Sequence, residues 1–327
     1  MRKLHVMLGV GFVAAAGLAV QALAPQAFAQ QGRGAAAASG EVHILKVQGN
    51  VYMLVGDGAN IAASVGKDGV FLVNGGTAEL SDKLLAALKT LTDKPVHYIV
   101  DTSADADHVG GNSNIARNGA PVLGGNLGAS NRGAAIVARE NVLTRMSAPT
   151  GKAASYPGDA WPTVTWFEGN KEIFFNNEAV VTMPAENAHT DGDSIVYFRR
   201  SDVIAAGEVF RDDTFPVIDL DRGGNIQGVI EGLNHILDIA IPEHEQEGGT
   251  YIIPGHGRLT DEHDVLEYRD MVTIVRDRVQ AMIKKGMTLD QVKAAKPTFE
   301  YDKRWSAPSG PNSTNGFVEA VYKSLKK

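Results

Sequence analysis

A group of acidic and histidine residues follows an apolar run near the start of the second hundred residues. The run Pro95–Val100 is mostly β-branched and aromatic and has the length of a strand. Asp105, Asp107 and His108 come shortly after its end. A turn that leaves a strand can aim such closely spaced side chains at one point, and carboxylates and imidazoles are common ligands of divalent metal ions. This segment is therefore a candidate metal site.

The same arrangement recurs at three later places, where one potential ligand stands shortly after an apolar run. These ligands are His189, Glu208 and His256. The whole candidate set is Asp105, Asp107, His108, His189, Glu208 and His256. Three imidazoles and three carboxylates are enough for one or two divalent ions. The alternative interpretation is that these side chains only cap turns and satisfy buried backbone groups.

The elements that position these residues can be read from hydrophobic spacing. Short alternating runs separated by glycine-containing turns predict an antiparallel meander over Glu41–Val73. Helices are expected at Ala78–Leu91 and Asn131–Met146, and a second series of strands at Val164–Ala206. Further helices are expected at Ile226–Ile239, Glu262–Lys284, Leu289–Ala295 and Asn315–Leu325. Two similar halves, each able to cover one sheet face with helices, predict an α/β fold with αββα layers.

A loop at Ser147–Pro162 contains glycine, proline and serine residues and is long enough to form a lid. Tyr156 and Trp161 lie near its end. These two aromatic side chains are expected either to pack within the lid or to contact a substrate.

The first residues have the features of a secretory signal peptide, with two cations before an apolar run and small residues at the end of Met1–Ala29. An uncleaved membrane anchor is the alternative, because the apolar run is near the lower length limit for crossing a bilayer. The signal peptide predicts export to the periplasm without stable membrane insertion after cleavage. The low-complexity segment 30–40 is expected to be a disordered linker.

Composition narrows the classes of partner. The chain has 327 residues, of which 44% are hydrophobic and 21% charged, so a large core is feasible. Its net charge is −7 and no basic run is present, which argues against nucleic-acid binding and leaves a small-molecule substrate as the expected partner. The absence of cysteine excludes disulfides and thiolate metal ligands. The oligomeric state is not indicated.

The order and spacing of the motifs resemble those of the metallo-β-lactamase superfamily. The matching segments are Asp68–Asn74, Thr102–Asn112, Ala138–Val142, Ala188–Asp193, Ala206–Phe210 and Ile253–Gly257. The resemblance implies a four-layer αββα sandwich over residues 41–260. Residues 261–327 would then form a small C-terminal helical extension packed on it.

The sequence departs from the family pattern at four positions. The family usually reads His-x-His-x-Asp-His, and Ser103 and Asp105 stand where its first two histidines would be. Asn74 and Glu208 replace two aspartates, the second of which bridges the metals. Ser103 is interpreted as a small residue where a ligand was lost. By resemblance, one metal position keeps only His189 of its histidines.

The other metal position, carried by Asp107, His108 and His256, is intact by resemblance. Zinc is the metal that the family implies, while the carboxylate-rich ligand set makes manganese or iron an alternative. The resemblance implies an exported metal-dependent hydrolase that acts on an ester, lactone, thioester or lactam with water oriented by Asp107. The competing hypothesis is a non-catalytic periplasmic protein that binds a metal or another ligand.

Overall fold

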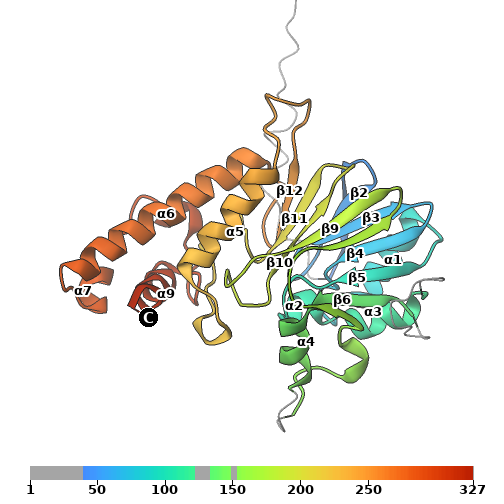
Figure 1. Ribbon diagram of the computed structural model, residues 1–327, viewed down its shortest axis with the longest axis horizontal. Helices are drawn as coiled ribbons and strands as arrows, with labels where there is room; N and C mark the ends of the chain where they lie inside the picture. Colours follow the sequence, from blue (N-terminus) through green and yellow to red (C-terminus); the bar gives the residue numbers. More distant parts are fainter. Residues whose placement is uncertain (1–39, 122–132, 149–152, 327) are drawn as a thin grey trace, which may run out of the picture. The chain divides into compact units, whose positions relative to one another are not determined.

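The strands of the first sheet lie side by side in the order in which they follow along the chain (Figure 1). They are β1 (His43–Gln48), β2 (Val51–Val55), β3 (Ile61–Gly66), β4 (Gly69–Val73), β5 (Val96–Val100), β6 (Ala135–Arg139) and β7 (Val164–Trp166). Pairing is antiparallel from β1 to β4, which confirms the expected meander. It is parallel from β4 to β7, so these strands end at the same edge of the sheet.

The structure is a computed structural model, and it describes residues 40–121, 133–148 and 153–326. These residues belong to one unit that spans Ala35–Lys327. The expected signal peptide and nearly all of the expected linker lie outside the described residues. Among the described residues, no helix has the length and apolar character needed to cross a membrane.

The second sheet has the spatial order β12-β11-β10-β9-β8. Its strands are β8 (Lys171–Phe175), β9 (Glu178–Pro184), β10 (Ser194–Phe198), β11 (Val203–Gly207) and β12 (Tyr251–Pro254). Pairing is antiparallel except between β11 and β12, which are parallel. The chain therefore leaves β11 and β12 at the same edge of this sheet.

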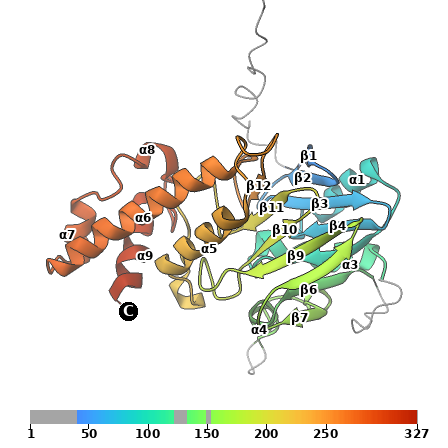
Figure 2. The same ribbon diagram turned by 45° about the horizontal axis from the view of Figure 1, so that its top comes forward.

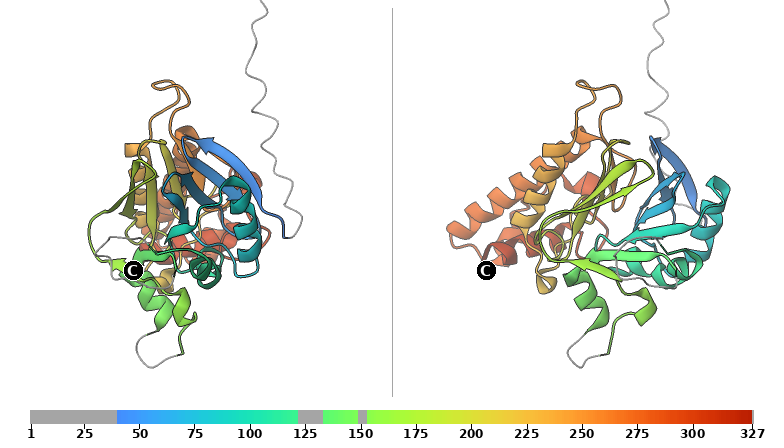
Figure 3. Two further views of the ribbon diagram at one scale, coloured as in Figure 1. Left: turned by 90° about the vertical axis from the view of Figure 1, so that its right-hand side faces the viewer. Right: turned by 45° about the vertical axis from the view of Figure 1, so that its right-hand side comes forward.

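Helices cover the outer face of each sheet (Figures 2 and 3). In the described part of the chain they are α1 (Ser81–Leu91), α2 (Ala106–Val109), α3 (Asn112–Asn118), α4 (Glu140–Ser147), α5 (Ile226–Ile239), α6 (Glu262–Lys284), α7 (Leu289–Ala294), α8 (Asp302–Trp305) and α9 (Thr314–Lys326), with 3₁₀ turns at Gly158–Ala160 and Leu220–Arg222. Side chains of α1 and α3 form one core with the first sheet. Side chains of α5, α6 and α9 form another with the second sheet.

A third core lies between the two sheets and completes the αββα sandwich. Phe71 is fully buried at its centre, with ring centroids 5.4 Å from Tyr98, 6.0 Å from Phe175 and 6.0 Å from Phe198. These rings come from both sheets. Because large aromatic side chains contribute much of the apolar area buried in a core, this cluster fixes the sheets against each other. The predicted α/β class and layer order are confirmed.

The helix expected at Asn131–Met146 is wrong in its first half. The segment contains strand β6, and helix α4 begins only at Glu140. Ile136, Val137 and Ala138 are all buried, because β6 is an inner strand of the parallel part of the sheet and is covered on both faces. A short apolar run that is buried on both faces has no alternation, so its spacing does not distinguish a strand from a helix.

Candidate metal site

Strand ends from both sheets bring the candidate ligands to one region. Asp107 and His108 lie on α2, the helical turn that follows β5. Glu208 follows β11 directly, and His256 follows β12. Because β11 and β12 are parallel neighbours, their ends place Glu208 and His256 close together. The first sheet thus supplies two of these side chains and the second sheet supplies the other two.

Asp107, His108 and His256 form a group with metal-ligand geometry. One ligand atom from each lies within 4.8 Å of the other two. Glu208 Oε1 lies 3.1 Å from His108 Nε2 and 2.9 Å from His256 Nε2, and Asp107 Oδ2 lies 3.2 Å from His256 Nε2. His108 is fully buried, whereas the side chain of Asp107 is 30% exposed. The assignment of these residues as metal ligands stays a prediction, and their geometry fits it.

A hydrogen-bond relay orients His108. Asn74 Oδ1 accepts hydrogen bonds from Thr102 N at 3.0 Å and from Thr102 Oγ1 at 2.9 Å. Since the hydroxyl hydrogen is used there, Thr102 Oγ1 accepts from His108 Nδ1, 3.1 Å away. With Nδ1 engaged by Thr102, Nε2 is the nitrogen that faces the Glu208 carboxylate and that would bind a cation. Second partners of this kind fix the orientation of metal-binding histidines.

Gly207 permits the close approach that the relay requires. Its φ is +53°, in the left-handed region that favours glycine, and a Cβ atom there would lie 2.6 Å from Thr102 Oγ1. Any larger residue would push against the hydroxyl that holds His108. The glycine before Glu208 thus has a structural role in the site.

The acidic and basic groups of the site shift one another's pKa values. Burial would raise the pKa of Glu208, but hydrogen bonds from His108 and His256 and the charge of Arg211 hold it well below its usual range. Burial would also raise the pKa of Asp107, but its hydrogen bond with His256 and the nearby imidazole of His108 lower that pKa below its usual value. Burial would lower the pKa of His256, yet its bonds to Asp107 and Glu208 raise it to about 9. Two ionised carboxylates therefore face two imidazoles, a donor set that suits zinc or iron.

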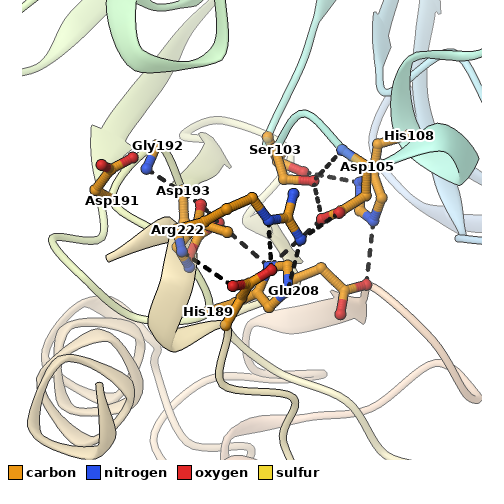
Figure 4. A network of polar contacts seen from close by, with 12 residues as sticks. Ser103, Asp105, His108, His189, Asp191, Gly192, Asp193, Glu208 and Arg222 are labelled. Atoms are coloured by element: carbon orange, nitrogen blue, oxygen red, sulfur yellow. Dashed lines mark hydrogen bonds and ion pairs between the residues drawn. The ribbon is translucent and has the colours of Figure 1, made fainter. Parts of the chain in front are cut away.

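Asp105 and His189 lie in a separate group, gathered around Arg222 (Figure 4). Arg222 Nη2 lies 2.7 Å from Asp105 Oδ1 and 3.5 Å from His189 Nε2. His189 Nδ1 lies 3.5 Å from Asp105 Oδ2 and 3.6 Å from Asp193 Oδ1. Burial opposes protonation of His189, but Asp193, Glu208 and Asp105 raise its pKa to about 9. The structure thus puts a guanidinium beside two of the expected ligands.

Sequence reasoning missed two arginines. Arg211 Nη1 binds Glu208 Oε2 at 3.0 Å, three residues away in the chain. Arg222 is far from Asp105 in the chain and reaches it only through the fold. The spacing of three residues between Glu208 and Arg211 was a usable signal, because an acid and a base this close in the sequence can form an ion pair. Nothing in the local pattern around Arg222 distinguishes it from a solvated arginine.

Two pockets open beside the site. One of about 740 Å³ is lined by Asp107, Tyr156 and Arg117 among others, and one of about 520 Å³ by Asp105, Arg145, Tyr156 and Arg222 among others. Tyr156 Oη donates to Ala104 O at 3.1 Å, and Trp161 Nε1 donates to Tyr156 O at 2.9 Å. Tyr156 is therefore bound to the motif loop and Trp161 to Tyr156, and Tyr156 lines both pockets.

The family model described as the metallo-beta-lactamase superfamily matches residues 46–256, more than half of the chain. The chain belongs to the metallo-beta-lactamase superfamily. The matched region of this superfamily member includes all six candidate ligands. A comparison with curated protein sequences found no significant match.

Solved structures similar to this superfamily member share its fold at low identity. A stereoselective inverting sec-alkylsulfatase from Pseudomonas sp. has a TM-score of 0.59 and 15% identity, with 86% of this chain and 50% of that chain covered. A metallo-beta-lactamase from Pontibacter korlensis has a TM-score of 0.53 and 14% identity, with 71% and 99% covered. The chain spans half the length of the alkylsulfatase. At these identities, the likeness shows the fold alone.

Replacing Thr102 with valine is expected to weaken zinc binding by about 10- to 100-fold, the usual effect of removing the partner that orients a metal-binding histidine. Valine keeps the shape of threonine but leaves His108 Nδ1 and Asn74 Oδ1 without the hydroxyl that joins them. Competition with a chromogenic chelator measures the affinity. Thr102→Ser retains the hydroxyl and is the control; equal zinc affinities for the valine and serine variants would argue against the relay.

Proposed function

We propose that this protein is an exported metal-dependent hydrolase. The observation that carries the proposal is the group formed by Asp107, His108 and His256, whose ligand atoms lie within 4.8 Å of one another. Catalytic zinc sites commonly have three protein ligands of this kind and one open position. Asp107 also lines the larger pocket, so a substrate in that pocket reaches the ligand group.

The residues of the chain divide the work of hydrolysis. When bound, a divalent ion supplies Lewis acidity toward water and toward the oxygen of the scissile group. Asp107, whose pKa is lowered, is ionised at neutral pH and accepts a hydrogen bond from the attacking water at its carboxylate. Glu208 holds the Nε2 atoms of His108 and His256 toward one point, and Arg211 holds Glu208. The Thr102 relay keeps the His108 ring in place.

The proposed substrates are small molecules with an ester, lactone, thioester or lactam bond. The similar solved structures include an alkylsulfatase and a metallo-beta-lactamase, so sulfate esters and lactams belong in the first substrate panel. A non-catalytic metal-binding protein is the second candidate function. The changes at Ser103 and Asp105, together with the arginine beside Asp105, favour that candidate because they alter one half of the family's usual site.

Removing the metal tests the proposed function. The protein without its signal segment is purified without chelator, its metal content is measured by elemental analysis, and hydrolysis of the panel is followed with and without a chelator. We expect about one equivalent of zinc, iron or manganese, and turnover that the chelator abolishes and the same metal restores. Bound metal with no turnover on any substrate supports the second candidate. No bound metal after incubation with all three ions contradicts both.

A further inference from the structure

We propose that the guanidinium of Arg222 takes the place of a second metal ion, so that this chain holds at most the ion bound by Asp107, His108 and His256. The proposal rests on the metal site of the proposed function but concerns the neighbouring half of the site, the group formed by Asp105, His189 and Arg222. The residues there do not fit a second ion, because a side-chain cation already makes the contacts that an ion would need. Figure 4 shows Arg222 reaching across from its loop to Asp105 and His189.

Asp105 has both carboxylate oxygens engaged. Its Oδ1 lies 2.7 Å from Arg222 Nη2, and its Oδ2 accepts a hydrogen bond from Ser103 Oγ at 2.9 Å. Ser103 and Asp105 are the two positions where the family motif has histidine. Two neutral imidazoles are therefore replaced by two different groups. The carboxylate of Asp105 binds the guanidinium, and the hydroxyl of Ser103 orients that carboxylate. The two departures from the motif form one coherent arrangement.

The charges of this half are consistent with a permanent cation. Asp105, Asp193 and Asp219 bring three carboxylates close to His189 and Arg222. Carboxylates that are partly or fully removed from water are stabilised by a positive partner, and arginine remains protonated at all accessible pH values. Arg222 lies 2.7 Å from Asp105 and 2.5 Å from Asp219 through different nitrogen atoms. It thus neutralises Asp105 and Asp219, two of the three acids that would otherwise attract a divalent ion.

The backbone of Arg222 is held independently of its side chain. Asp219 Oδ1 accepts a hydrogen bond from Arg222 N at 3.0 Å. The Arg222 carbonyl accepts from Arg145 Nη2 at 2.8 Å and from Asp191 N at 3.0 Å. The 3₁₀ turn Leu220–Arg222 is therefore fixed at both its start and its end. The backbone therefore fixes Arg222 in this position, and only 27% of its side chain is exposed.

The number of metal ions bound by Arg222 variants tests the proposal. Wild type, Arg222→Ala and Arg222→Lys are stripped of metal, dialysed against excess zinc, and analysed by elemental analysis and calorimetric titration. We expect Arg222→Ala to bind about one equivalent more than wild type, because Asp105 and His189 lose the cation that contacts them. Arg222→Lys keeps the positive charge and is expected to match wild type. Combining Arg222→Ala with His189→Ala should remove the gain.

A matched control separates the local effect from a change in net charge. Arg117→Ala removes an equivalent cation from an exposed pair with Asp159 and should leave the metal content unchanged. Circular dichroism and thermal unfolding verify that the variants are folded, and Arg222→Gln, which keeps polar contacts, provides a second variant that lacks the charge. A folded Ala or Gln variant that binds no more zinc than wild type overturns the proposal, as does a gain in Arg222→Lys.

The result is distinguishable from failure of the proposed function. The proposal on Arg222 is decided by the difference in bound metal between variant and wild type. The proposed function is decided by the metal content and turnover of wild type itself. Wild type that binds none of zinc, iron and manganese contradicts the proposed function, and a gain of about one equivalent of zinc in Arg222→Ala would still support the role of Arg222.

Discussion

Replacing His256 or His108 with alanine is expected to remove the bound metal and to reduce turnover by about 1000-fold or more, because Lewis acidity is worth several kcal/mol of transition-state stabilisation. Each imidazole supplies one of the nitrogen atoms of the ligand group. The loss of either leaves two ligands, and catalytic sites commonly need three. Elemental analysis and the rate on the best substrate of the panel measure the two effects together.

His263 provides the matched control for these histidine variants. It is an exposed residue of α6, outside the ligand group. His263→Ala should keep wild-type metal content and rate. Turnover that survives in His256→Ala after its metal has been lost would show that the reaction does not use this site.

Replacing Arg211 with methionine is expected to destabilise the metal-free protein by about 1.5–3 kcal/mol, because a buried charge-assisted hydrogen bond is lost while His108 and His256 still contact Glu208. The side chains of Glu208 and Arg211 are 5% and 10% exposed, and Nη1 lies 3.0 Å from Oε2. Methionine fills much of the same space but carries no charge. Zinc should restore part of the lost stability, because a bound cation compensates the carboxylate and because metal binds to the folded state.

Chemical denaturation with and without zinc measures this change in the free energy of unfolding. Arg117→Met is the matched control, because its pair with Asp159 is exposed on both sides and is expected to contribute less than about 1 kcal/mol. Equal losses of stability in the two variants would mean that the Arg211–Glu208 pair does not stabilise the site. A loss in Arg211→Met that zinc deepens would contradict the assignment of Glu208 to the metal site.

The sequence predicted the ligand group because its determinants are local. Asp107, His108 and His256 each follow an apolar run; parallel pairing aligns strand ends within each sheet, and the packing of the two sheets brings these ends together. The structure brings these three together as expected, and the metal itself stays a prediction. The layered fold was predictable for the same reason, since it depends on the order of runs and turns.

The parts that were missed depend on contacts between distant segments. Arg222 meets Asp105 only after the chain has formed both sheets, so the expected role of Asp105 as a metal ligand took no account of a competing cation. Strand β6 was expected as helix because its residues, such as Ile136 and Val137, are all buried and show no alternation. Their burial depends on the neighbouring strands of the sheet. In both cases the missing information was a set of tertiary contacts.

The four side chains around the candidate metal come from both halves of the sandwich. Asp107 and His108 are delivered by the first sheet, while Glu208 and His256 are delivered by the second. A cut in the chain between β7 and β8 would divide these side chains between two fragments, and neither fragment would retain the site. A bound ion would cross-link the two sheets. Loss of the metal would therefore weaken the packing of one sheet against the other as well as abolish the proposed hydrolysis.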